Sequence, residues 1–165
     1  MNTVELKSWG LYPFQKQTPH RCEWRIDVSK KMQSLYGSHD STLAYGNGRS
    51  YGDSCLAQSN QVMHTLPMNR FIKADWSKGE LVAEAGVTLD QIIKLIIPKG
   101  WFLKITPGTK FVTLGGAIAN DVHGKNHHKL GTFGRFVKEV GICRSDKGYL
   151  VCSREENIDL FKATI

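Results

Sequence analysis

One stretch of the chain has apolar residues at clear helical spacing. The apolar side chains recur at i, i+3, i+4, i+7 and i+8, which places them on one helical face: Leu89, Ile92, Ile93, Ile96 and Ile97. Thr88-Leu89-Asp90-Gln91 has the spacing of a capping box at the start of this stretch. Pro98 and Gly100 follow it, so the pattern predicts a helix that begins after Thr88 and ends near Pro98.

Weaker patterns predict the elements of the first half of the chain. A loosely helical stretch runs from Trp24 to Tyr36, and Gly37 stands where that helix would end. Residues 42–45 read as a short strand that leads into a glycine-rich segment. Three more strands are expected over 61–66, 70–75 and 80–85, and together they predict one small sheet.

In the second half, apolar residues over 101–105 predict a strand that would complete a βαβ-like unit with the helix before it. Alternation over 137–143 and 149–152, with a turn at Asp146-Lys147-Gly148, predicts an antiparallel hairpin. Ser153-Arg154-Glu155-Glu156 reads as a second capping box that starts a helix, which the end of the chain interrupts.

The segment Gly46-Asn47-Gly48-Arg49-Ser50-Tyr51-Gly52-Asp53 is the first candidate site. Its three glycines leave backbone N–H groups open to a ligand, and amides of this kind make a concavity for a pyrophosphate. Arg49 and Ser50 add a charge and a hydroxyl. The spacing fits neither a P-loop nor a Rossmann fingerprint, and a tight structural turn remains the alternative.

A second candidate site lies in the segment 107–121, where Thr113 is placed to cap a short helix. That helix would start with Gly115, Gly116 and Ala117, whose small side chains would let an anion approach free N–H groups at its beginning. The alternative is that the glycine pair serves close helix packing.

Three histidines follow in Asp121-Val122-His123-Gly124-Lys125-Asn126-His127-His128. A metal site is disfavoured, because Gly124 breaks the helix that i, i+4 ligation would use and no carboxylate or cysteine stands at ligand spacing. His123 is instead interpreted as a residue that lies beside a cofactor ring, whereas His127 and His128 are interpreted as surface residues.

Composition narrows the class of partner. The chain has 165 residues, 41% of them hydrophobic, and a formal net charge of +7, which favours anionic partners. No basic stripe or recognised nucleic-acid motif is present, so nucleic acid is not expected as a partner. The sequence lacks an apolar run of membrane-spanning length and a leader pattern, and its four cysteines are spaced as reduced thiols, so a cytoplasmic location is expected.

Taken in order, these segments resemble the FAD-binding domain of the vanillyl-alcohol-oxidase-type (PCMH-type) flavoenzymes, in particular the decaprenylphosphoryl-ribose oxidase branch. The motifs that carry the resemblance are Gly46–Asp53, Pro107-Gly108-Thr109, Val112–Ala119, and His123–His128 followed by Gly131-Thr132-Phe133-Gly134. The resemblance implies an α+β fold of two lobes, with 1–100 as the first and 101–165 as the start of a C-terminally incomplete second. By the resemblance, the C-terminal substrate domain of the family is expected to lie outside this chain.

The resemblance also implies which residues hold FAD. The glycine loop and the Thr113–Gly116 segment would hold the pyrophosphate, and His123 would lie by the flavin ring; no catalytic residue is assigned, and no metal is expected. Some members attach FAD covalently through a histidine in the glycine loop, where this chain has Arg49, so non-covalent FAD is expected. The implied contacts are Tyr45, Gly46, Asn47, Gly48, Arg49, Ser50, Tyr51, Ser54, Pro107, Gly108, Thr109, Val112, Thr113, Gly115, Gly116, Ala117, Asn120, Val122, His123 and Gly124.

Complete relatives would oxidise an alcohol carbon of a small-molecule or lipid-phosphate-linked sugar by hydride transfer to flavin. Contact with the inner face of the membrane and a partner reductase are the interactions that such a reaction implies. Two alternatives stay open at this point. One is an FAD-dependent oxidase of a soluble sugar, alditol or lactone, and the other is a non-catalytic FAD-binding module.

Overall fold

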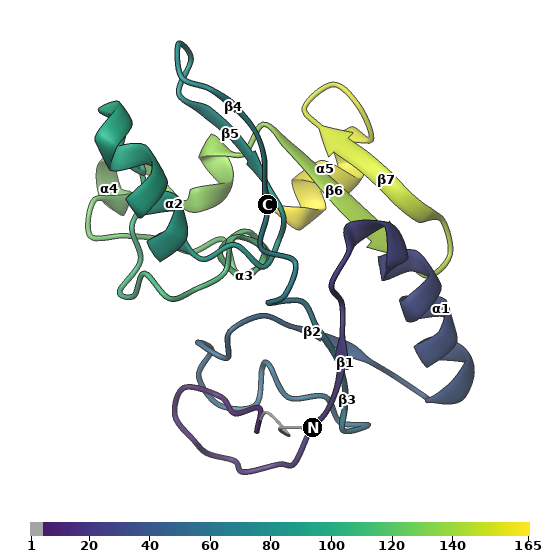
Figure 1. The fold of residues 1–165 in the computed structure, drawn as a ribbon. Coiled ribbons are helices and arrows are strands. Elements are labelled where there is room, and N and C mark those ends of the chain that lie inside the picture. Colours follow the sequence, from purple (N-terminus) through teal and green to yellow (C-terminus); the bar gives the residue numbers. More distant parts are fainter. Residues whose placement is uncertain (1–4) are drawn as a thin grey trace.

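The computed structural model describes residues 5–165, and the first group of elements is a small parallel sheet in the lower part of Figure 1. Its strands are β1 (Thr18–Arg21), β2 (Leu43–Tyr45) and β3 (Gln61–His64), in the order β1-β3-β2. Between β1 and β2 the chain forms the 3-10 turn η1 (Arg25–Asp27) and helix α1 (Val28–Ser38). The predicted helix is therefore confirmed, although it continues through Gly37 and ends one residue later.

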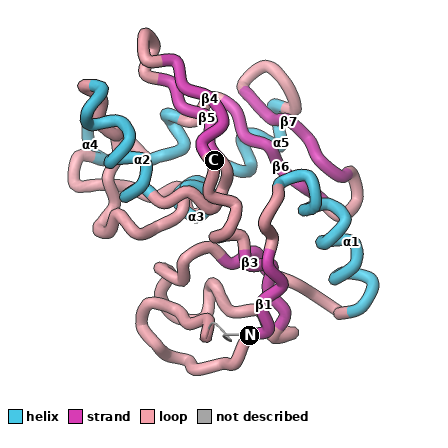
Figure 2. Tube along the Cα trace, in the orientation of Figure 1, coloured by secondary structure: helices cyan, strands magenta, loops and turns pink. Residues whose placement is uncertain are grey.

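Two antiparallel hairpins lie above this sheet (Figures 1 and 2). The first pairs β4 (Phe71–Asp75) with β5 (Glu80–Ala83), and the second pairs β6 (Glu139–Arg144) with β7 (Gly148–Ser153). All three strands expected over 61–85 are present, and so is the C-terminal hairpin. The expectation of one sheet for the first three is wrong, because β3 pairs with β1 and β2 while β4 and β5 pair with each other.

Helix α2 (Leu89–Ile96) begins at the predicted capping box, in which Thr88 and Gln91 exchange side-chain and backbone hydrogen bonds. It runs into the 3-10 turn η2 (Ile97–Lys99) and ends at Gly100, which has a φ of +78°. The strand predicted over 101–105 is not formed. The backbone groups of this stretch make hydrogen bonds that are not part of a β-sheet. The Trp101 amide donates to the Ile96 carbonyl, and Asn126 Nδ2 donates to the Lys104 carbonyl.

The remaining helices are short: α3 (Leu114–Ala119), α4 (His127–Leu130), the 3-10 turn η3 (Phe133–Phe136) and α5 (Ile158–Thr164). Helix α3 begins at Thr113 as expected. Helix α5 is present, but its predicted cap is wrong. Ser153 Oγ accepts from the amides of Glu155 and Glu156 in a separate turn, and the residue that immediately precedes α5 is Asn157, with a φ of +49°.

Apolar packing joins segments on both sides of residue 100. One buried cluster contains Leu6, Tyr45, Leu56 and Val62 and lies under the glycine-rich segment. Another surrounds α2 and α3 and combines residues from β5, α2 and the stretch up to Phe133. The division into lobes 1–100 and 101–165 stays a prediction. No helix within residues 5–165 combines the length and apolar character needed to cross a membrane.

Candidate functional site

The glycine-rich loop leaves the sheet at the end of β2, where Tyr45 is buried. The Tyr45 hydroxyl donates to the Lys7 carbonyl at 2.6 Å and accepts from the Lys7 amide at 3.1 Å. Gly48 has a φ of +57°, and a Cβ at this position would collide with the Lys7 carbonyl. Glycine is therefore required at 48 both by the backbone conformation and by the N-terminal segment that lies against it.

Several backbone amides of this loop have no protein acceptor within residues 5–165. Within residues 5–165, the amides of Asn47, Gly48, Arg49 and Tyr51 donate to no protein acceptor. A Cβ on Gly52 would meet nothing within 4 Å, so that part of the loop is open as well. Several unused N–H groups in one short loop make a site for an anion.

The start of α3 differs, because its first amides already have protein acceptors. Leu114 N donates to the Val87 carbonyl at 2.7 Å, Gly115 N donates to the Ala85 carbonyl at 2.8 Å, and Gly116 N donates to Thr113 Oγ1 at 3.1 Å. The expectation of free N–H groups at this helix start is wrong. Gly115 serves close packing, since a Cβ there would lie 2.9 Å from the Ala85 Cβ.

The structure brings the loop and α3 into direct contact. A Cβ on Gly46 would lie 2.5 Å from Thr113 Oγ1. Asn47 Nδ2 donates to the Phe111 carbonyl at 2.8 Å, which fixes the loop against the segment before α3. The two segments that the sequence assigned to one pyrophosphate site are therefore neighbours in space.

A separate hollow of about 570 Å³ lies where the Pro-Gly-Thr turn meets the histidine segment. It is lined by Thr106, Pro107, Gly108, His123, Gly124, Lys125 and His127. A Cβ on Gly124 would lie 2.7 Å from the Thr106 carbonyl, so glycine lets the two segments approach. His123 and His127 are exposed, with ring centroids 5.3 Å apart, and no group of three potential metal ligands occurs within residues 5–165.

The other expected contact residues make local interactions. Ser54 Oγ donates to the Tyr51 carbonyl, and Asn120 Nδ2 donates to the Gly116 carbonyl. Thr109 Oγ1 accepts from the Phe111 amide, while Val122 packs in the cluster around α2. Whether each of these residues touches a cofactor stays a prediction.

Electrostatics around the loop favour neutral groups on the sheet side. Burial raises the pKa of the Tyr45 hydroxyl and of the Cys55 thiol, so both stay protonated near neutral pH. Burial, and then the charge of Arg21, lowers the pKa of His64. Arg49 brings a positive charge to the loop, and no acidic group within residues 5–165 lies within 4.0 Å of it.

A family model described as "FAD binding domain" matches residues 22–153. The chain belongs to this family. The FAD binding domain is 38% identical over 125 residues to the decaprenylphosphoryl-beta-D-ribose oxidase of Mycolicibacterium smegmatis, covering 74% of this chain and 27% of that protein. It is 28% identical over 118 residues to the L-gulonolactone oxidase of Mus musculus, covering 72% of this chain and 26% of that protein.

Solved structures agree with the fold. The FAD binding domain superposes on 6-hydroxy-D-nicotine oxidase from Arthrobacter nicotinovorans with a TM-score of 0.79 at 18% identity, covering 92% of this chain and 34% of that one. The PCMH-type α+β fold expected from the sequence is thereby confirmed. The chain spans about a quarter to a third of the length of these proteins.

The residues present fit FAD, the cofactor of this family. The amides after β2 that have no acceptor within residues 5–165, together with the positive charge of Arg49, match a pyrophosphate. Sequence reasoning missed Lys7 and Trp9, which bond to Tyr45 and Ser50, and Phe111, whose carbonyl anchors the loop. No local pattern marks those residues, because their contacts with the loop span about 40 or more positions of sequence.

Proposed function

We propose that this FAD binding domain holds FAD non-covalently, with the pyrophosphate at the loop Gly46–Tyr51. The observation that carries the proposal is the set of loop amides, beside Arg49, that have no acceptor within residues 5–165. Arg49 stands where a linking histidine occurs in covalent members of the family, and a guanidinium does not make that bond. The start of α3 would support the loop by packing rather than by donating to the phosphates.

The reaction that we propose is oxidation of an alcohol carbon of a sugar or polyprenyl-phosphate-linked sugar. FAD, when bound, supplies the acceptor of a hydride. The chain's own residues bind the phosphates at Gly46–Tyr51 and shape the hollow at Pro107-Gly108, where the His123 side chain is exposed. The 38% identity to decaprenylphosphoryl-beta-D-ribose oxidase supports a phosphate-bearing substrate, whereas the net charge of +7 does not decide between substrates because the FAD pyrophosphate also needs positive charge.

A second candidate is oxidation of a soluble sugar lactone. It is favoured by the similarity to L-gulonolactone oxidase and to the putative D-arabinono-1,4-lactone oxidase of Neurospora crassa, which is 30% identical over 120 residues. A partner reductase would be needed for the first reaction if oxygen does not reoxidise the flavin. Peripheral contact with the inner face of the membrane is part of the first proposal only.

The cofactor proposal is tested by the visible absorbance spectrum of the purified protein, recorded as isolated and after addition of FAD and gel filtration. Flavin bands that co-elute with the protein and pass into the supernatant on acid precipitation are the expected result. Bands that stay in the precipitate would contradict non-covalent attachment. Absence of flavin after reconstitution would contradict FAD binding by this chain.

The two substrate proposals are separated with the whole protein that carries this domain. Anaerobic addition of a polyprenyl-phosphoryl ribose should bleach the flavin absorbance, whereas L-gulonolactone should leave it unchanged. Bleaching by the lactone alone would favour the second candidate.

A further inference from the structure

The N-terminal segment Glu5–Trp9 lies against the glycine loop and precedes the residues that the family model matches. Leu6 is 4% exposed and packs with Tyr45 in the cluster under the loop. Lys7 bonds through its backbone to the Tyr45 hydroxyl, and the Trp9 amide donates to the Ser50 carbonyl at 2.9 Å. The segment is thereby fixed to both ends of Tyr45–Ser50.

The Arg49 guanidinium lies near two aromatic rings, one from Trp9 in the N-terminal segment and one from Phe111 before α3. Its guanidinium carbon is 5.4 Å from the centroid of the Trp9 ring and 5.9 Å from the centroid of the Phe111 ring. Both distances are within the range of cation–π attraction. The Trp9 side of this arrangement depends on the N-terminal segment, and the Phe111 side depends on the segment that leads to α3.

Two buried polar side-chain atoms, one on Arg49 and one on the neighbour of Trp9 in sequence, make no hydrogen bond within residues 5–165. Arg49 Nε and Ser8 Oγ are buried and have no hydrogen-bond partner in the described part of the chain. Ser8 is only 3% exposed. A buried donor without an acceptor is costly, and an arginine in this state matches a phosphate oxygen.

We propose that Trp9, together with Phe111, holds the Arg49 guanidinium in position for the pyrophosphate of FAD. Trp9 is then a positioning residue of the cofactor site, and the segment Glu5–Trp9 is part of that site. This inference rests on the proposed function, because it requires FAD at the glycine loop. Its consequence is that removing the Trp9 ring weakens binding of phosphate-bearing flavins selectively.

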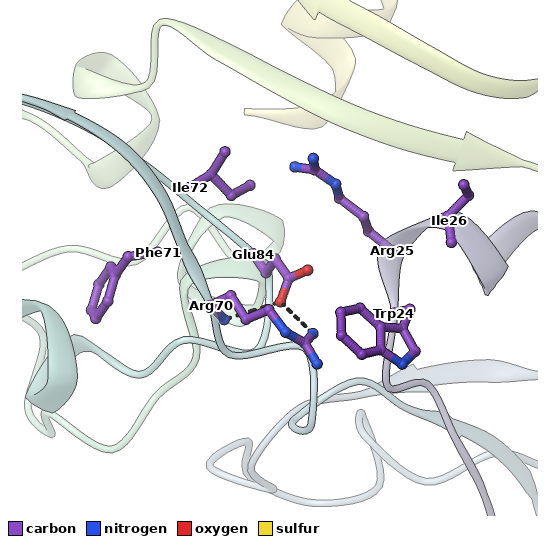
Figure 3. A pocket seen from close by; sticks show the side chains of 7 residues that line it. All are labelled: Trp24, Arg25, Ile26, Arg70, Phe71, Ile72 and Glu84. Atoms are coloured by element: carbon purple, nitrogen blue, oxygen red, sulfur yellow. Dashed lines mark hydrogen bonds and ion pairs between the residues drawn. The ribbon is translucent and has the colours of Figure 1, made fainter.

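The chain contains a matched pair far from the loop in sequence. Arg70 lies over the Trp24 ring at 3.7 Å and also bonds to Glu84 Oε2 at 3.2 Å (Figure 3). The Glu84 carboxylate, whose side chain is 5% exposed, satisfies this arginine. Trp24→Ala therefore removes an arginine–tryptophan contact of the same kind from a place where no phosphate is expected.

The test measures dissociation constants of FAD and of riboflavin, which lacks phosphates, by flavin fluorescence and calorimetry. The proteins are the wild type, Trp9→Ala, Trp9→Phe and Trp24→Ala, each checked for folding by circular dichroism. Trp9→Ala should raise the Kd of FAD about fivefold and leave that of riboflavin unchanged. Trp9→Phe should restore most of the loss, and Trp24→Ala should change neither constant.

Equal weakening of FAD and riboflavin by Trp9→Ala, or no weakening at all, would overturn the positioning role while the proposed function stands. If the wild type binds neither ligand, the proposed function fails and this inference fails with it. Phe111→Leu removes the other ring and leaves the N-terminal segment intact. It should give the same selective loss for FAD, and a variant of normal FAD affinity would count against the proposal.

Discussion

The glycine loop after β2 and the start of helix α3 look alike in sequence but differ in structure. Both are rich in small residues, and both were expected to offer backbone N–H groups to a pyrophosphate. In the loop, the amides of Asn47, Gly48, Arg49 and Tyr51 have no acceptor among residues 5–165. At α3, the amides of Leu114, Gly115 and Gly116 are bonded to protein oxygens. A glycine-rich segment therefore indicates that another group comes close to the backbone, but it does not show whether that group is a ligand or another part of the protein.

The largest difference should follow from a negative charge placed in the loop. Ser50→Asp would put a carboxylate beside the proposed pyrophosphate, and like charges in contact cost several kcal/mol. The Kd of FAD should rise by about 100-fold. Titration of the variant by calorimetry measures this, with Ser50→Asn as the neutral control of similar size. If the two variants bound FAD with equal affinity, the placement of the phosphates at this loop would be contradicted.

The next effect concerns the stability of α3. Gly115→Val would press a side chain against Ala85, whose Cβ is 2.9 Å from the place of the new Cβ, and should lower the free energy of unfolding by about 1–3 kcal/mol. Gly37→Val, in α1, meets nothing within 4 Å and should change it by only about 0.5 kcal/mol. Urea denaturation compares them. The FAD affinity of folded Gly115→Val should stay near that of the wild type. A lost FAD affinity would instead indicate that the start of α3 contacts the phosphates directly.

The smallest expected effect is a pH dependence of stability that comes from His64, in the strand β3 next to β2. The pKa of His64 is lowered in the folded state, mainly by burial, so the unfolded chain binds a proton at higher pH than the folded chain. The free energy of unfolding therefore reaches its full value, as far as this group is concerned, above the ordinary histidine pKa of about 6.5, and it falls as the pH drops below that value. Thermal unfolding between pH 7.5 and 5.5 should show this fall. In His64→Gln that part of the slope should disappear, and an unchanged slope would assign it to another group.

Local signals explain which parts of the fold the sequence predicted. Helix α2 has a capping box and a full apolar face, and the β6–β7 hairpin has a turn between two alternating stretches, so each is specified by adjacent residues. Strand β1 was missed because Thr18–Arg21 has no alternation and becomes a strand only by pairing with β3, about 40 residues later. The stretch 101–105 has the composition of a strand but lacks a partner.

The site divides in the same way. The loop and its position after a strand were predicted, because strand and glycines are contiguous in sequence. The state of the α3 amides depends on the carbonyls of Ala85 and Val87, which come from a different segment. The rings around Arg49 come from Trp9 and Phe111, some 40 and 60 residues away in opposite directions. Neither feature leaves a pattern that adjacent residues could reveal.

The two hydrogen bonds between Tyr45 and Lys7 also bear on how the molecule folds. They join residues 38 positions apart, and β1 pairs with β3 over a still longer separation, as in the pair of Thr18 with Gln61. Contacts of this separation form only after the intervening chain has given up its loop-closure entropy, so they slow folding relative to local helices and hairpins. The glycine loop should therefore acquire its final shape late, after α2 and the β6–β7 hairpin. During synthesis, the N-terminal segment leaves the ribosome first, but it cannot form these hydrogen bonds until Tyr45 has also emerged.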